Sequence, residues 1–275
     1  MTCAYQGYRT AGGGVFASGR MYVMQSTLSG NTIEATEPEQ NANGGGVAAN
    51  PVFTIAGSTF SSNSADGVGG GAIGSLSSYH LPVPTAPSDA SGISNSTFTW
   101  NSAELAGAFA DANALPVANS TVAFNTSRYG GAVAILDSGT AQNDYTLYLD
   151  STIIARNSID GPGGHAADLA TSPQLTLTVI GSNNLVGSAD PNVTLPPDTL
   201  NSDPMLLPLA DNGGPTWTMA LATGSPAINT GSNPWNFDTD QRGAGFPRVY
   251  GSAADIGAYE VQSFPDEVFA SGFDP

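Results

Sequence analysis

The sequence predicts an all-β fold, a right-handed parallel β-helix (solenoid) of about six coils that ends in a C-terminal cap of short strands and loops. Three observations predict it. A short phrase recurs through the N-terminal part of the chain, a Gly cluster precedes each copy, and the residues that dominate the composition favour short strands and tight turns.

The repeated phrase is a Ser-Thr pair, then an apolar residue, then an Asn a few positions later. Its five copies span 26–31, 58–63, 96–101, 120–125 and 151–157, and the fifth has one extra residue before its Asn. Stacking the copies places equivalent residues above one another along the solenoid axis. We expect one corner to carry a hydrogen-bonded ladder of Asn31, Asn63, Asn101, Asn125 and Asn157. We expect the core to contain a stack of Leu28, Phe60, Phe98, Val122 and Ile153.

The Gly clusters lie where the chain must turn or where neighbouring coils approach closely. They include residues 12–14, 44–46, 69–71, 130–131 and 163–164. Between each Gly cluster and the next Ser-Thr pair lies a short alternating segment, so each coil is expected to have about three short strands. Solenoids that bind calcium repeat an Asp within such Gly-rich turns. No Asp is seen to recur in register here, and calcium therefore stays open only as an alternative.

Composition and charge limit the function classes. The 275 residues carry a net charge of −17, with six Arg and no Lys, which excludes a basic surface for nucleic acid. No apolar run of about 18 residues is present, so no transmembrane segment is predicted. Cys3 is the only cysteine, so no internal disulfide forms. No signal peptide precedes the first coil, and we expect a fragment of a longer secreted protein whose open N-terminal coil could associate with a partner.

One segment departs from the repeat. Residues 75–90 contain three prolines, which prevent regular strand pairing and predict a loop that leaves the solenoid. This loop holds Tyr79 and His80, which are candidate ligand-binding residues, with an ordinary surface loop as the alternative.

The repeat ends near residue 188, which divides the chain into a solenoid (1–188), a C-terminal capping module (189–262) and a tail (263–275). The last coil of a solenoid exposes strand edges, and the module is expected to cover them. Arg242 is expected to form a partly buried ion pair with Asp255 and Glu260 that locks the cap. A catalytic pair of Asp240 and Asp255 is the alternative.

The module contains the phrases ADNGGPT at 210–216, GSPAINTG at 224–231, TDQRG at 239–243 and ADIGAYE at 254–260. In this order they resemble the C-terminal module of secreted bacterial right-handed β-helix proteins named for a "choice-of-anchor Q" domain. The upstream coils resemble the same proteins and, more distantly, the repeats of polymorphic outer membrane proteins. The resemblance implies a secreted protein, or one on the bacterial outer cell surface, whose anchoring varies between members. It implies no particular reaction.

Catalytic candidates are few. Parallel β-helices that hydrolyse polysaccharides need clustered carboxylates with a nearby His. His165 and Asp168 are the nearest approach, and a structural turn is the alternative reading. A polyuronate lyase would need a cationic base beside carboxylates. The candidates for such a site are Arg128 or Arg156, near Asp150 or Asp137.

These observations favour a secreted or cell-surface scaffold, adhesin-like or glycan-binding, without a recognisable catalytic site. Its expected partners are glycans or cell-surface components. The alternative is an extracellular polysaccharide-active enzyme, a carboxylate-based glycoside hydrolase or lyase. No cofactor is indicated, apart from the open alternative of calcium.

Overall fold

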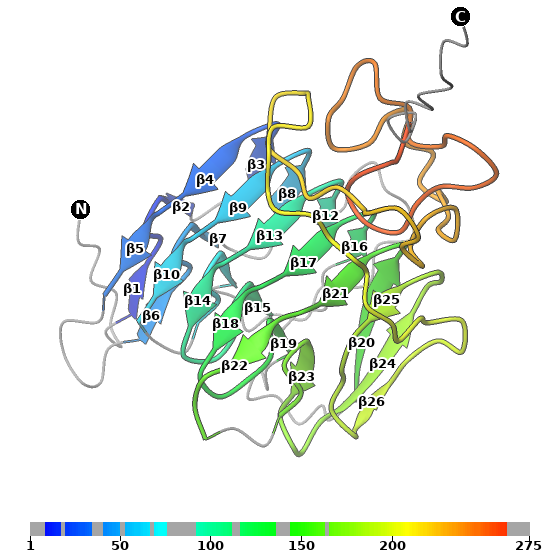
Figure 1. Ribbon diagram of the computed structural model, residues 1–275. Coiled ribbons are helices and arrows are strands. Elements are labelled where there is room, and N and C mark those ends of the chain that lie inside the picture. Colours follow the sequence, from blue (N-terminus) through cyan, green and yellow to red (C-terminus); the bar gives the residue numbers. More distant parts are fainter. Residues whose placement is uncertain are drawn as a thin grey trace, which may run out of the picture.

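The computed structural model describes residues 9–17, 20–34, 41–49, 53–66, 69–75, 92–111, 116–135, 144–162 and 165–262. Within these ranges there are strands and no helix, so none of them contains a helix that could cross a membrane. All strand pairs between coils are parallel, and each strand pairs with its equivalent one coil away (Figure 1). The prediction of an all-β parallel β-helix is confirmed.

Four stacked sheets build the solenoid. The first, which we call the phrase sheet, carries the repeated phrases in six strands. Its strands are β4 (Thr27–Ser29), β9 (Thr59–Ser61), β13 (Thr97–Thr99), β17 (Thr121–Ala123), β21 (Ile153–Ala155) and β25 (Leu185–Val186). These six strands define six coils, coil 1 being the most N-terminal.

The second sheet precedes the phrase sheet in each coil and has seven strands. They are β3 (Met21–Met24), β8 (Phe53–Ala56), β12 (Gly92–Ser94), β16 (Val117–Ala118), β20 (Asp144–Asp150), β24 (Thr176–Ile180) and β26 (Val193–Thr194). Strand β26 lies beyond residue 188, and Leu200 continues the phrase sheet by pairing with Leu185. The solenoid therefore extends about a dozen residues further than the sequence suggests.

The third sheet follows the Gly clusters. Its six strands are β2 (Val15–Ala17), β7 (Val47–Ala49), β11 (Ile73–Ser75), β15 (Phe109–Asp111), β19 (Val133–Ile135) and β23 (Leu169–Thr171). The fourth consists of two-residue strands, namely β5 (Thr32–Ile33), β10 (Ser64–Ala65), β14 (Ser102–Ala103), β18 (Thr126–Ser127) and β22 (Ser158–Ile159). A separate pair joins β1 (Arg9–Ala11) to β6 (Asn41–Asn43). Each of coils 1 to 5 thus contributes one strand to each of the four sheets, where the sequence predicted about three strands per coil. The fourth strand was missed because two residues give too short a pattern to be recognised in the sequence.

The core is a continuous apolar stack between the sheets. Phe60 and Phe98 lie in neighbouring coils with ring centroids 5.0 Å apart and nearly parallel planes. The stack continues through Val122 to Ile154, because Val122 pairs with Ile154 in the register. The prediction that Ile153 fills this position is therefore wrong. Thr152 takes the place of the phrase's Ser in coil 5, so the fifth copy has no extra residue and Ile153 faces outward.

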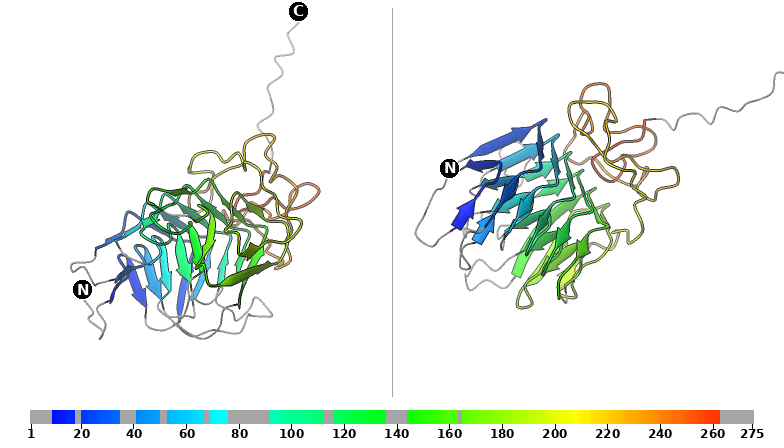
Figure 2. Two further views of the ribbon diagram at one scale, coloured as in Figure 1. Left: turned by 90° about the horizontal axis from the view of Figure 1, so that it is seen from below. Right: turned by 60° about the vertical axis from the view of Figure 1, so that its left-hand side comes forward.

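The C-terminal module, taken from here on as residues 201–262, lies against the flank of the solenoid and not over its last coil (Figures 1 and 2). Its contacts run from Gly57 in coil 2 to Asn183 in coil 6. A second apolar cluster fills the interface, where Ile153 and Leu185 of the phrase sheet pack with Leu221 and Ile256. The expectation of a cap on the last coil is corrected for residues 201–262, because Ile153, Leu185 and the phrase Thr residues give the phrase sheet an outward face on which the module packs and forms hydrogen bonds.

Candidate functional site

The five repeated Asn residues form one continuous chain of hydrogen bonds. In each step the Nδ2 of one Asn donates to the Oδ1 of the Asn in the next coil, at 2.9 Å for Asn31–Asn63, Asn63–Asn101 and Asn101–Asn125 and 3.0 Å for Asn125–Asn157. The same Oδ1 also accepts the backbone N–H of the preceding Asn, as Asn101 does from Asn63 at 3.0 Å. The Asn ladder therefore has a direction, because in every step the donor lies in the more N-terminal coil and the acceptor in the next coil.

Asp168 ends this ladder. Its Oδ1 accepts from Nδ2 of Asn157 at 2.8 Å, and its Oδ2 accepts from the hydroxyl of Ser188 at 2.8 Å. Asp168 is not the sixth member of the Asn repeat, because Ala189 occupies the position equivalent to Asn157 in coil 6. Asp168 lies directly before β23, at the position that Ala132 has before β19 in the preceding coil. Burial raises the pKa of Asp168, and its hydrogen bonds from Asn157 and Ser188 oppose that rise. This carboxylate is an acceptor at the end of a structural ladder and is only 4% exposed.

A second ladder uses the Ser of each phrase, and the sequence reasoning missed it. The backbone N–H of each of these residues donates to the side-chain oxygen of its equivalent in the next coil, for example Ser58 to Ser96 at 3.1 Å. Each hydroxyl also donates to the carbonyl two residues earlier, as Ser96 does to Ser94 at 2.7 Å. The row comprises Ser26, Ser58, Ser96, Ser120, Thr152 and Asn184. Its signal in the sequence was the constant small hydroxyl residue beside the Thr.

His165 lies with Asp190 and not with Asp168. Its Nδ1 is 2.6 Å from Oδ2 of Asp190, and the side chains of His165 and Asp190 are 29% and 4% exposed. Asp190 also accepts the backbone N–H groups of Ala166 and Thr171, which fix its position at the last coil. The candidate pair of His165 and Asp168 is thus divided between two separate hydrogen-bond networks.

The other catalytic candidates are also separated. Arg128 lies 3.6 Å from Glu104, and Arg156 pairs with Asp203 on the surface. Asp150 instead accepts from the backbone and hydroxyl of Ser182. Asp137, Tyr79 and His80 lie outside the described residues.

The Thr of the phrase docks the C-terminal module in coils 2 to 4. Gln241, buried in the interface, accepts from Oγ1 of Thr97 at 2.6 Å and donates to Oγ1 of Thr59 at 2.9 Å. Thr121 in coil 4 accepts the backbone N–H of Ala258 at 3.0 Å. Thr27 in coil 1 is exposed. One phrase therefore supplies four roles: Ser and Asn form ladders, the apolar residue fills the core, and Thr faces the module.

The turn before each phrase adds further docking contacts. Asn95, Asn119 and Asn183 have positive φ, and their side chains reach carbonyls of the module. Asn95 Nδ2 donates to the carbonyl of Thr239 at 3.1 Å, and Asn119 Nδ2 donates to the carbonyl of Ser232 at 3.1 Å. A left-handed backbone suits Asn because its short side chain can bond locally or to a neighbour.

Two buried Arg residues organise the module, with partners that differ from the sequence prediction. Arg242 pairs with Asp240 at 2.6 Å and lies between the rings of Phe246 and Tyr259, at 4.0 and 3.9 Å. It reaches Glu260 only at the backbone carbonyl. The predicted pairing of Arg242 with the side chains of Asp255 and Glu260 is therefore corrected, because Asp240 lies within the same turn.

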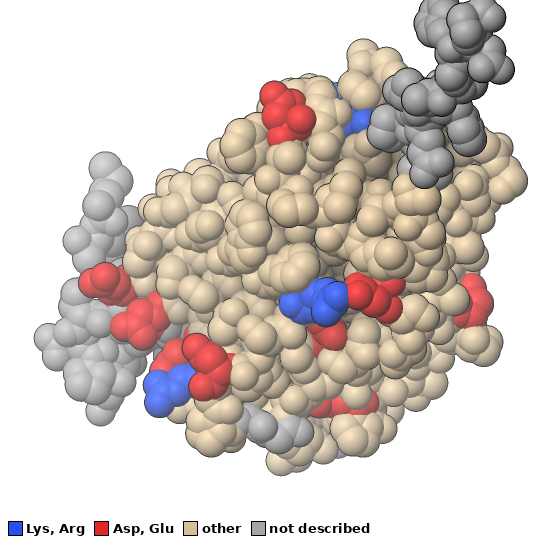
Figure 3. Space-filling view, viewed as in Figure 1, with Lys and Arg blue, Asp and Glu red and all other residues tan. Residues whose placement is uncertain are grey.

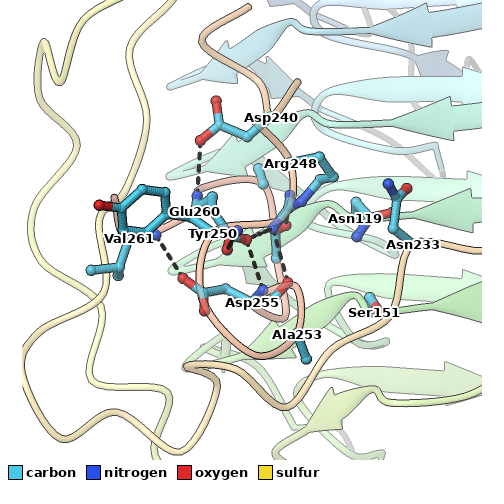
Figure 4. Close-up of polar contacts among 12 residues, drawn as sticks. Asn119, Ser151, Asn233, Asp240, Arg248, Tyr250, Ala253, Asp255, Glu260 and Val261 are labelled. Carbon is cyan, nitrogen blue, oxygen red and sulfur yellow. Dashed lines mark hydrogen bonds and ion pairs between the residues drawn. The ribbon is translucent and has the colours of Figure 1, made fainter. Parts of the chain in front are cut away.

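Arg248 is the residue that pairs with Glu260, at 2.9 Å, and the two side chains are fully buried (Figure 4). Glu260 also accepts the backbone N–H groups of Tyr250 and Asp255, each at 2.8 Å. Burial raises the pKa of Glu260 to about 7, although Arg248 and the N–H donors act in the other direction. The sequence reasoning named Arg242 and overlooked Arg248, which no local motif distinguishes.

The alternative pair of Asp240 and Asp255 does not form an exposed acid–base site. Asp255 accepts backbone N–H groups of Asn229 and Val261, both at 2.7 Å. Asp240 accepts from Arg242 and from the backbone of Glu260. Both carboxylates are buried and occupied in holding loops together.

Carboxylates recur in register at a position outside the Gly-rich turns, which the sequence reasoning did not consider. Glu34, Asp66 and Glu104 follow the short strands β5, β10 and β14 in successive coils, and Arg128 continues the row after β18. They were overlooked because they lie after the Asn ladder and not in the Gly-rich turns. Among the described residues, no group of three or more His, Cys, Asp or Glu is arranged to hold a metal ion.

The largest exposed side chain next to the Asn ladder is Trp100, which is 48% exposed. It precedes Asn101 at the corner between the phrase sheet and the short strands, and Phe124 holds the same place in the next coil. Their coils are joined by the backbone N–H of Trp100, which donates to the carbonyl of Phe124 at 3.2 Å. The two aromatic residues thus form a row along the solenoid axis.

No family model, curated protein or solved structure matches the chain.

Proposed function

We propose that the protein is a secreted or cell-surface β-helix scaffold that binds glycans, in the manner of an adhesin, and that it has no catalytic site of its own. The net charge of −17 on 275 residues supports an extracellular role because it favours solubility. The same charge disfavours contact with polyanions. The resemblance of the C-terminal phrases to choice-of-anchor Q modules supports the location at the bacterial cell surface.

One observation carries the proposal: the carboxylates that could act as acid or base are already used to hold the fold. Asp168 ends the Asn ladder, Asp240 and Glu260 hold buried Arg residues, and Asp255 binds two backbone N–H groups. A glycoside hydrolase needs two carboxylates that face one substrate bond. Asp168 belongs to the solenoid ladder, whereas Asp240, Asp255 and Glu260 share one network of Arg side chains and backbone N–H groups in the module. All four are almost fully buried, so none of them faces a substrate.

The second candidate is a polysaccharide-active enzyme, which the pair of His165 and Asp190 favours. A partly exposed imidazole oriented by a buried carboxylate is a common arrangement for a general base. His165→Asn would remove this base while keeping a hydrogen-bond donor toward Asp190.

A combined screen tests the two candidates. The wild-type protein is incubated with neutral and acidic polysaccharides, with and without calcium, and retention, reducing ends and unsaturated uronate are measured. The scaffold proposal predicts retention on at least one polysaccharide without any rise in either product. A reproducible product that disappears in His165→Asn or Asp168→Asn, with the unfolding midpoint unchanged, would establish the enzyme instead.

A further inference from the structure

We propose that the row formed by Trp100 and Phe124 is a binding site for a neutral glycan chain that runs along the solenoid axis. This inference rests on the proposed glycan-binding function and names the site for it. The row belongs to a corner at which each of coils 1 to 5 has a left-handed residue just before the ladder Asn.

The backbone at this corner makes the aromatic residues unexpected. The residues at the five equivalent positions have φ of +67°, +56°, +56°, +59° and +63° in coils 1 to 5. They are Gly30, Ser62, Trp100, Phe124 and Arg156. Left-handed backbone is unfavourable for a residue with a bulky side chain, and Gly or Ser satisfies the same turn in coils 1 and 2. Strain of this kind is found at binding sites, where the side chain has a task outside the fold.

Exposure gives the second argument. Trp100 leaves 48% of its surface in solvent, and Phe124 is partly exposed in the neighbouring coil. A left-handed corner residue projects away from the coil, so the aromatic surface faces solvent. Stacked coils lie about 4.8 Å apart, which sets the two aromatic residues one after the other along the axis. That is the arrangement in which successive rings of an extended chain can each meet an aromatic surface.

Hydroxyl groups lie beside the aromatic row. The short strands of coils 3 and 4 begin with Ser102 and Thr126, two residues after Trp100 and Phe124. Ser102 Oγ donates to Ser64 Oγ at 3.1 Å, and Thr126 Oγ1 lies 3.0 Å from Ser158 Oγ. Sugar rings combine apolar C–H faces with hydroxyl edges, so an aromatic row flanked by hydroxyls matches both parts of a glycan.

Charge selects a neutral glycan over an anionic one. A row of carboxylates, Glu34, Asp66 and Glu104, follows the short strands near the aromatic row, and most of the rest of this face is uncharged (Figure 3). Arg156, the next residue along the row, is paired with Asp203, and the whole chain carries −17. Single-stranded nucleic acid also stacks on aromatic side chains, but it requires a cationic groove to follow its backbone. The negative net charge of the chain would also repel acidic polysaccharides.

The test uses Trp100→Ser, which gives coil 3 the corner residue of coil 2. Affinity gel electrophoresis of the full chain is run with mixed-linkage β-glucan, galactomannan and xylan as neutral probes, and with polygalacturonate and single-stranded DNA as anionic ones. We expect the wild type to be retarded by a neutral probe, and Trp100→Ser to weaken that binding at least about tenfold. The unfolding midpoint should stay the same or rise, because the strained aromatic residue is removed.

Trp217→Ala is the matched control, since Trp217 is 55% exposed but lies on the C-terminal module. It should bind the neutral probe like the wild type. Binding unchanged in Trp100→Ser while the wild type is retained would overturn this site and leave the proposed function standing. Retardation of the wild type by polygalacturonate alone would overturn this site and leave the proposed function standing, whereas retardation by none of the polysaccharides would overturn both. A clear fall in the unfolding midpoint of Trp100→Ser would make Trp100 a packing residue and remove the basis of the inference.

Discussion

The solenoid and the C-terminal module satisfy their buried polar groups in different ways. In the solenoid, neutral Asn and Ser side chains repeat the same hydrogen bond from coil to coil, as between Asn63 and Asn101. In the module, regular pairing is reduced to isolated bridges, and two buried ion pairs hold the loops. One region spreads its polar interactions over many equal contacts, while the other concentrates them in Arg242 and Arg248.

This difference predicts how each region responds to substitution. A ladder that loses one member keeps its other steps, so the loss is limited to the neutral hydrogen bonds of that one side chain. A buried ion pair that loses one member leaves an isolated charge in an apolar environment, which is far less favourable. The module should therefore be sensitive to single changes at a few residues, and the solenoid should tolerate single changes better.

The largest effect is expected for Arg248→Met. At pH 8, above the pKa of about 7, Glu260 is ionised in the wild type, so this change leaves it buried without its cation. Breaking such a pair costs about 3–5 kcal/mol of the free energy of unfolding. Urea unfolding followed by circular dichroism measures the loss, and hydrogen exchange should show it first in residues 201–262. Arg156→Met is the matched control, because its pair with Asp203 is exposed and should contribute at most about 1 kcal/mol.

Two results would oppose this view of the module. One is an Arg248→Met loss no larger than that of Arg156→Met. The other is a double variant, Arg248→Met with Glu260→Gln, that is no more stable than Arg248→Met alone. The second comparison removes the isolated charge and should recover part of the stability.

The next effect is a fall in stability as pH rises. Folded Glu260 keeps its proton up to a pKa of about 7, whereas the unfolded chain releases it near 4.5. Between these values the folded state binds more protons than the unfolded state, so the free energy of unfolding decreases with increasing pH and levels off above 7. The rise in the pKa of Glu260 corresponds to a decrease of about 3 kcal/mol in the free energy of unfolding over this pH range. Burial also raises the pKa of Asp150, Asp168 and Asp255, which adds to the same trend.

Thermal unfolding from pH 4.5 to 8 checks the direction, with Glu260→Gln as the control that should flatten the slope. Hydrogen exchange at pH 5 and pH 7.5 then separates the two regions. Protection of backbone amides from exchange should decrease more in the module than in the ladders, since Glu260, whose pKa is raised to about 7, lies in the module. Stability that increases over this pH range would contradict the assignment.

The fold could be predicted because the phrase repeats chemistry as well as spacing. Asn at one corner and an apolar residue three positions earlier determine which residues stack, and those positions are visible in the sequence. The fifth phrase was misaligned because Ser151 and Thr152 both fit its start. Counting three positions back from Asn157 gives Ile154. The pairing of Thr121 with Ile153 confirms that Thr152 takes the place of the Ser.

The candidate site was less accessible to sequence reasoning. His165 and Asp168 are three residues apart, but they face different networks because Asp168 enters the ladder and His165 turns toward Asp190. The lateral placement of the module depends on long-range contacts such as that between Gln241 and Thr97. No local pattern encodes such contacts, although the constant Thr of each phrase was an available sign of an outward docking face.

The smallest effect is expected within the ladder, and it compares the middle with the end. Asn63 is fully buried, accepts from Asn31, and donates to Asn101 and to the carbonyl of Leu28. Asn63→Ala should cost about 1–3 kcal/mol, because these partners lose buried hydrogen bonds. Asn31→Ala is the matched control, since Asn31 is partly exposed and water can replace its partners. Equal unfolding midpoints for Asn63→Ala and the wild type would show that the ladder does not stabilise the solenoid. A larger loss for Asn63→Ala than for Arg248→Met would reverse the contrast between the two regions.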